Sequence, residues 1–184
     1  MLRRRLFASG FVLFAAVLVL HAGTSFAGRK AGPGACAAAG TVPVDDATRR
    51  QAARAVLCLV NRLRAARALR RVRASRPLRR AAASHGTDMV RRKYFSHVGL
   101  DGASVTTRVR RSGYARVRPI AVSETLAWAP HGSPRMLVRA LMRSRGHRSV
   151  LLDRRQRHIG VGLVLGAPVP GAGQGSTLVL AFGE

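Results

Sequence analysis

Residues 119–128 read PIAVSETLAW, an apolar and partly β-branched run that holds one carboxylate, Glu124. Such a run predicts an extended or irregular segment that is buried in the fold. Glu124 is the only glutamate in the interior of the chain, and burying a lone carboxylate is costly. We therefore expect Glu124 either to hold a proton or to pair with an arginine or an imidazole. An ion pair with an arginine that serves structure alone is the alternative to a functional site.

Helical patterns dominate the chain before this run. Polar residues that suit helix N-caps precede segments in which apolar residues recur every three or four positions. Pro77 near the start of the second segment and Gly113 at the end of the third are typical of helix boundaries. The sequence therefore predicts helices over residues 45–66, 75–93 and 104–113.

Strand patterns follow the run, after one more helix. Ser133 and Pro134 open this helix, which we expect to stop near Gly146. Residues 159–165 and 177–182 are strand-like and are joined by a Gly/Pro-rich segment, so they predict an antiparallel hairpin with a long loop. Helices that precede a terminal β region indicate a mixed α+β architecture with helices packed on a sheet.

The N-terminal part of the chain has the composition of a targeting segment. Three arginines, residues 3–5, precede an apolar run over residues 6–20 and a small-x-small sequence that ends at Ala27. This pattern predicts a secretory signal peptide over residues 1–27, with an uncleaved N-terminal anchor as the alternative. Residues 28–44 are rich in Gly, Ala and Pro and predict a flexible linker, so the folded domain is expected over residues 45–184.

The chain has two cysteines, Cys36 in the predicted linker and Cys58 in the first predicted helix. Export to an oxidising compartment favours a disulfide between them. The alternative is a buried free Cys58 and a loosely held Cys36.

The charge of the chain is strongly positive, with 33 Lys and Arg against 7 Asp and Glu among 184 residues and a formal net charge of +26. So few carboxylates exclude a multi-metal carboxylate site or a caged calcium site. The surplus predicts salt-dependent attraction to anionic partners, here cell-envelope polymers or lipid head groups. Aromatic residues make up only 5%, which argues against specific nucleic-acid binding. The alternative is that the arginines only cover solvated faces. A monomer is the default expectation.

Two histidines occupy positions that suit a site. His97 follows an aromatic pair on a loop with glycines, and His147 follows Gly146 at a predicted helix end. His85 lies on a helix face three residues before Asp88 and is explained by packing or a local hydrogen bond. The chain has no G-x-S-x-G, H-E-x-x-H, Walker A or G-x-G-x-x-G motif, which removes the commonest protease and nucleotide-binding classes.

As a set, several short motifs resemble the CAP superfamily of cysteine-rich secretory, antigen 5 and pathogenesis-related proteins, in its bacterial SCP-like secreted branch. The resemblance covers residues 54–183. Its parts occur in the family's order and are, along this sequence, CLVNR at 58–62, YFSH at 94–97, SETLAW at 123–128, SRGHRSVLL at 144–152 and IGVG at 159–162.

The resemblance implies an α+β fold, a three-layer α-β-α sandwich with an antiparallel sheet and a cleft lined by His97, Glu124 and His147. The family's second acidic position is Ser144 here, and the residue after the glutamate is Thr125. These side chains would form a hydrogen-bonded cluster, or His97 and His147 would weakly hold a divalent metal such as zinc. No other cofactor is implied.

The function expected from this resemblance is that of a secreted, extracellular binding module for a small apolar or envelope-derived ligand. A hydrolase that uses the same cleft is one alternative, because a glutamate and a histidine can act as general acid and base. A cationic binder of anionic polymers is the other.

Overall fold

The computed structural model describes residues 33–114 and 121–184. The predicted signal peptide, the first residues of the predicted linker and the start of the PIAVSETLAW run lie outside these residues. Among these residues, no helix combines the length and the apolar character that crossing a membrane requires.

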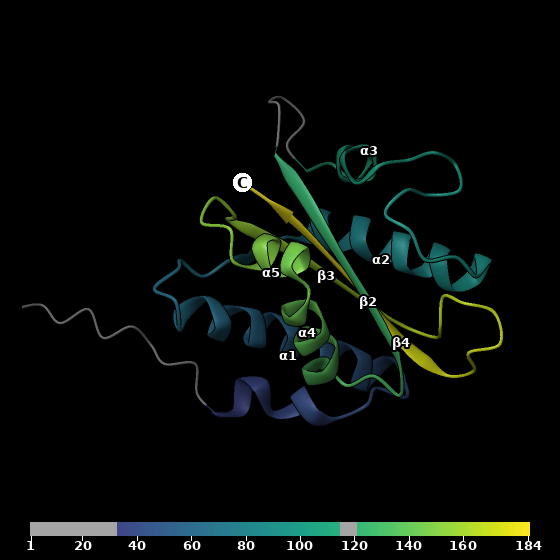
Figure 1. Ribbon diagram of the computed structural model, residues 1–184, viewed down its shortest axis with the longest axis horizontal. Coiled ribbons are helices and arrows are strands. Elements are labelled where there is room, and N and C mark those ends of the chain that lie inside the picture. The colour runs from purple at the N-terminus through teal and green to yellow at the C-terminus, as the bar shows by residue number, and fades with distance from the viewer. Residues whose placement is uncertain (1–32, 115–120) are drawn as a thin grey trace, which may run out of the picture. The chain divides into compact units, whose positions relative to one another are not determined.

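The described part of the chain contains both helices and strands (Figure 1). In chain order they are the 3-10 helix η1 (Pro33–Gly40), α1 (Asp46–Ala65), β1 (Arg73–Ala74), α2 (Arg76–Arg92), α3 (Val105–Arg111), β2 (Val122–Pro130), α4 (Pro134–Arg143), α5 (Arg145–Leu151), β3 (His158–Leu165) and β4 (Gly175–Gly183).

The four strands form one sheet in the order β1-β3-β4-β2. The hairpin of β3 and β4 is antiparallel as predicted, and β2 pairs antiparallel with the other side of β4. The two-residue strand β1 instead pairs parallel with the start of β3. The sheet is therefore mixed and not wholly antiparallel, and β2 forms one of its edges.

Helices cover both faces of the sheet, so the described domain has the expected three layers (Figure 1). One apolar core joins α1, α4 and α5 to Leu178, Leu180 and Phe182 of β4. A second core joins α2 and α3 to Val179 and Ala181, which alternate with them along the same strand. Because β4 is buried on both faces, both cores meet at this central strand.

Helix α2 lies directly on the backbone of β3, and two glycines make this approach possible. A Cβ atom on Gly160 would overlap the main chain of Leu78 and Arg79, and one on Gly162 would lie 2.5 Å from the carbonyl carbon of Ala82. Real Cβ atoms essentially never come so close to backbone atoms. The IGVG sequence of β3 thus sets the distance between the sheet and this helix layer.

Side-chain caps begin the helices at the positions that the sequence indicates. Asp45 caps α1 in a reciprocal capping box with Thr48, and Ser75 and Ser104 accept from backbone N–H groups of α2 and α3. One helix boundary is different from the prediction. The helix from Ser133 does not continue to Gly146, because Ser144 leaves helical geometry and caps a separate helix, α5.

The predicted disulfide is present between Cys36 and Cys58. It joins η1 to α1, and Ala39 is fully buried in the small core around the two cysteines. Part of the segment predicted as a linker is therefore packed onto the domain. Bridging residues 22 positions apart is worth about 3 kcal/mol in the loop-entropy description.

Candidate functional site

The candidate site lies beside the first half of the edge strand β2. Glu124 comes from β2, His97 from the loop after α2, and His147 from the first turn of α5. The strand alternation turns Glu124 toward the α2 and α3 layer, together with Val122 and Leu126. The structure thus brings elements that are far apart in the sequence to one edge of the sheet.

The carboxylate of Glu124 is buried and has a partner on each oxygen. Its side chain is 2% exposed; Nδ1 of His97 donates to Oε1 at 3.0 Å, and Nη2 of Arg108 donates to Oε2 at 2.8 Å. Both partner types that the sequence left open, an imidazole and an arginine, are therefore present at once. Charge-assisted bonds to both oxygens compensate the loss of water around the carboxylate.

Arg108 also ties the loop of His97 to helix α3. Nη1 donates to the carbonyl oxygen of Ala103 at 2.6 Å, and Nη2 donates to that of His97 at 3.0 Å. The side chain is 11% exposed, so these bonds form largely away from water. No sequence pattern distinguishes this arginine from the other cations, because its role depends on tertiary contacts alone.

His85 of α2 lies on the inner side of the same cluster. It is buried, its Nε2 donates to the carbonyl oxygen of Ser96 at 2.8 Å, and Nε2 lies 4.0 Å from Oε1 of Glu124. A carbonyl only accepts, so the hydrogen on Nε2 leaves Nδ1 unprotonated in the neutral ring. Burial lowers the pKa of His85 below the usual 6.5, against the opposing effect of the Glu124 charge. His85 is buried and hydrogen-bonded, and these are the two explanations that the sequence suggests, but its position next to Glu124 was not predicted.

The low pKa of His85 predicts a loss of stability in mild acid. Between the ordinary histidine pKa and the lower value in the fold, the unfolded chain binds more protons, so the free energy of unfolding decreases as pH falls below about 6.5. We expect His85→Gln, which keeps an N–H donor, to flatten this dependence. Urea unfolding at about pH 7.5 and about pH 5.5 measures it. The exposed His131→Asn variant is the control, and equal pH dependence in both variants would contradict the prediction.

His147 lies next to His97 but does not bond to Glu124. The centroids of the two imidazole rings are 6.5 Å apart, and their planes meet at 52°. Burial and then the nearby charge of His97 lower the pKa of His147. The side chain of His97 is 53% exposed and His147 is half-buried, so the imidazole of His97 faces solvent while Glu124 is buried behind it.

The donor set suits a hydrogen-bonded cluster better than a resident metal ion. Both oxygens of Glu124 already have partners, which leaves only imidazole nitrogens of His97 and His147. A structural zinc site takes four protein ligands and a catalytic one takes three. Within residues 33–114 and 121–184, no group of three or more His, Cys, Asp or Glu side chains could hold a metal ion.

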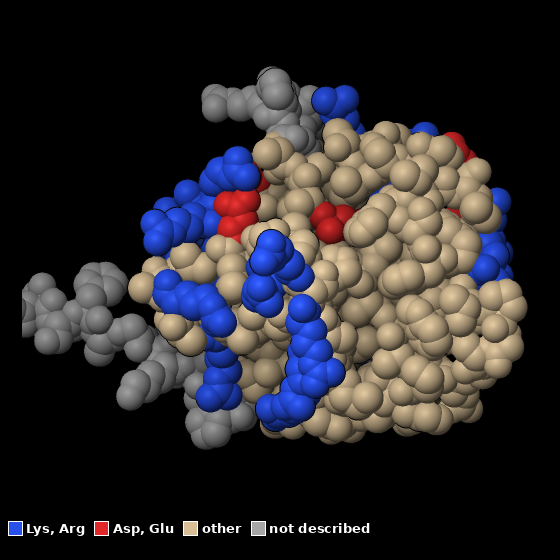
Figure 2. All heavy atoms as spheres, in the orientation of Figure 1, with Lys and Arg blue, Asp and Glu red and all other residues tan. Residues whose placement is uncertain are grey.

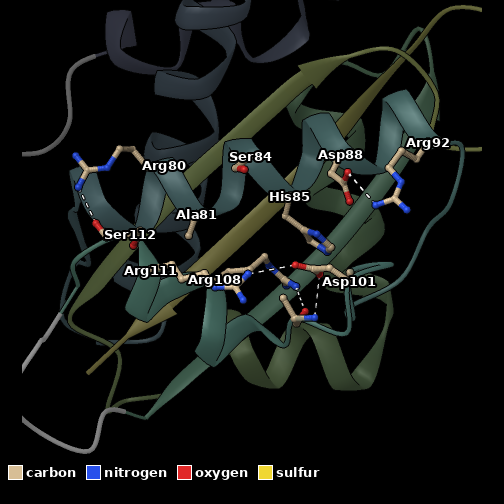
Figure 3. Close-up of a pocket in the computed structure, with 12 residues that line it drawn as sticks. Arg80, Ala81, Ser84, His85, Asp88, Arg92, Asp101, Arg108, Arg111 and Ser112 are labelled. Atoms are coloured by element: carbon tan, nitrogen blue, oxygen red, sulfur yellow. Dashed lines mark hydrogen bonds and ion pairs between the residues drawn. The ribbon is translucent and has the colours of Figure 1, made fainter.

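Two further features surround this cluster. A cavity of about 480 Å³ between α2 and α3 has Ser84, His85, Asp88, Asp101 and Arg108 among its lining residues (Figure 3). On the loop that carries His97, three large apolar side chains are exposed to solvent. They are Phe95, Val98 and Leu100.

A protein-family model named for the cysteine-rich secretory proteins, or CAP, matches residues 57–171, which is more than half of the chain. The chain belongs to the CAP family. Among curated protein sequences, none matches it significantly.

Solved structures of three bacterial proteins share the fold. An outer surface protein of Borrelia burgdorferi has a TM-score of 0.63 at 17% identity, and the match covers 77% of this chain and 96% of that one. An SCP-domain extracellular protein of Bacillus anthracis str. Ames has a TM-score of 0.59 at 22% identity, covering 75% of this chain and 44% of that one. A cysteine-rich secretory protein of Staphylococcus aureus gives 0.53 at 14% identity, with 76% and 40% covered. This chain therefore spans less than half the length of the last two chains.

Proposed function

We propose that this CAP protein is an exported binding module of the cell envelope or extracellular space. Its ligand is a small apolar or envelope-derived molecule, bound beside His97, Glu124 and His147. The apolar and basic N-terminal sequence supports export. Structural relatives described as an outer surface protein and as an extracellular protein support the same location.

The observation that carries this proposal is the combination of exposed apolar side chains with a fixed polar cluster. Phe95, Val98 and Leu100 are exposed on the loop whose His97 is held by Glu124. Soluble proteins rarely leave neighbouring large apolar side chains in water without a partner. Ligand sites usually join such apolar surface to a few polar groups with fixed orientation.

A hydrolase is the second candidate function, and the bond between Glu124 and His97 favours it. A carboxylate on Nδ1 orients an imidazole so that Nε2 can accept a proton from water or substrate. Binding is better supported, because Arg108 holds the other oxygen of Glu124 and both cysteines are in the disulfide.

Attraction to anionic polymers or lipid head groups is the third candidate. Figure 2 shows that lysine and arginine gather over α4 and α5 on the face drawn, while the right-hand half of the same face shows few. Exposed arginines of these two helices include Arg135, Arg139, Arg143 and Arg145. Such a surface favours salt-dependent association without a defined ligand.

Native mass spectrometry of the protein purified at high salt tests the binding proposal. We expect a retained small molecule in the wild type and its loss from Phe95→Ser/Val98→Ser and from His97→Ala. Met136→Ser removes another exposed apolar side chain, on α4, and is expected to retain the molecule. Circular dichroism verifies that each variant folds.

Other results would favour the competing functions. Hydrolysis of a nitrophenyl ester that His97→Ala abolishes would indicate the hydrolase. A wild-type protein that retains no small molecule would contradict the binding module. If the wild type and the loop variants also bind a heparin column equally well, the cationic binder is indicated.

A further inference from the structure

The outer edge of strand β3 is free over most of its length. The two residues of β1 pair only with His158 and Ile159, and the chain then turns into α2. From Gly160 to Leu165, β3 has β4 on one side and no strand on the other within the described residues. An unpaired edge of this kind can template another strand.

Main-chain groups of Val161 and Leu163 point out from this edge. The carbonyl oxygen of Ile159 accepts from Ser75 on the β1 side, and alternate residues of a strand turn their main-chain groups to the same side. No hydrogen bond joins these groups of Val161 and Leu163 to any described residue. Val161 is half-buried and Leu163 is only 2% exposed, so this edge is reached only through the groove that both residues line.

A groove of about 450 Å³ gives access to this edge. One wall is a stripe of α1 that includes Arg50, Arg54 and Leu57, and the other is a stripe of α2 that includes Arg76 and Arg79. Residues three, four and seven positions apart lie on the same side of a helix. The apolar part of the lining consists of Ala53, Leu57, Ala83, Ile159, Val161 and Leu163.

The rim of the groove is positively charged and contains no carboxylate. Five arginines line it: Arg49, Arg50, Arg54, Arg76 and Arg79. Arg49 pairs with Asp46 at 2.9 Å. The other four form no ion pair with a described residue. An anionic occupant could therefore form ion pairs with four guanidinium groups that have no partner among the described residues.

We propose that the groove between α1 and α2 binds an acidic extended polypeptide segment, which adds to the free edge of β3 as a further strand. Main-chain bonds to Val161 and Leu163 would hold the segment, and its carboxylates would face the arginine rim. An anionic acyl lipid could use the apolar lining and the charge, but it has no row of donors and acceptors for the strand edge. The unpaired main-chain groups therefore favour a peptide.

Fluorescence anisotropy with the full chain and a labelled peptide of alternating Glu and Val tests the charge component. We expect Arg76→Gln/Arg79→Gln to weaken binding by about tenfold. Arg139→Gln/Arg143→Gln removes the same charge from α4 and is expected to weaken it by less than about twofold. Circular dichroism shows whether both variants keep the fold. Equal weakening by both pairs would mean general electrostatic attraction and would overturn the proposal.

Backbone-methylated peptides test the strand pairing. N-methylation of one alternate set of amides removes the donors that face β3, whereas methylation of the other set leaves them in place. We expect methylation of the amides that face β3 to reduce binding about tenfold or more, and methylation of the other amides to have little effect. Equal binding by both, or no binding of the parent peptide, would overturn the proposal. Oleate binding that depends on Arg76 and Arg79, without peptide binding, would identify the groove as a lipid site and overturn it as well.

Discussion

Gly160→Ala is expected to lower the free energy of unfolding by about 3 kcal/mol or more, and Gly160→Val to prevent folding. The new Cβ atom would overlap the backbone of Leu78 and Arg79 in α2. A side chain could turn away from such an overlap, but a helix backbone can yield only if the whole helix moves off the sheet. That movement would open the apolar core between α2, Val179 and Ala181, and lost packing there is not recovered elsewhere.

Gly146→Ala is the matched control for this substitution. Gly146 lies inside α5, and a Cβ atom there would meet nothing within 4 Å. Alanine is a better helix former than glycine, so this variant should be as stable as the wild type or more stable by up to about 1 kcal/mol. Urea unfolding followed by far-UV circular dichroism compares the two. If Gly160→Ala unfolds at the same urea concentration as Gly146→Ala, the stability of the fold does not depend on the close packing of Gly160 against α2, and the prediction is wrong.

Much of the fold was predictable because local signals agree with the tertiary structure. Ser75, Ser104 and Ser133 each cap a helix as the sequence indicates, and the two C-terminal strands pair as predicted. The break at Ser144 was missed because the apolar spacing gave no reason to stop before Gly146. The parallel pairing of β1 was missed because a two-residue strand has no periodicity to detect.

The candidate site was predictable to a smaller extent. A lone glutamate in an apolar run needs a partner, and this physical requirement indicates Glu124 without knowledge of the fold. The proximity of His97 and His147 followed only from the family resemblance. Arg108 was hidden among many arginines, and His85 lay on a helix face that is also expected to pack, so only the three-dimensional contacts identify them.

Arg108→Met is expected to lower the free energy of unfolding by about 3–5 kcal/mol, because it leaves Glu124 buried beside His97 without its arginine. The bonds to the carbonyl oxygens of His97 and Ala103 are lost at the same time, so the loop of the site should also loosen. Arg111→Met on the same helix is the control. Its bond to Asp101 is exposed on both sides, and such pairs contribute about 1 kcal/mol or less.

A double-mutant cycle separates the charge from the packing. If the cost of Arg108→Met comes from the stranded carboxylate of Glu124, then Arg108→Met/Glu124→Leu should recover part of the lost stability, since no buried charge remains. If the loss of unfolding free energy in the double variant equals the sum of the losses in the two single variants, Arg108 and Glu124 are not coupled. The bonds of Arg108 to the loop carbonyls then explain the effect. Urea unfolding of the four proteins at about pH 7.5 gives the coupling energy. A cost for Arg108→Met no larger than that for Arg111→Met would show that Glu124 is stabilised by His97 alone.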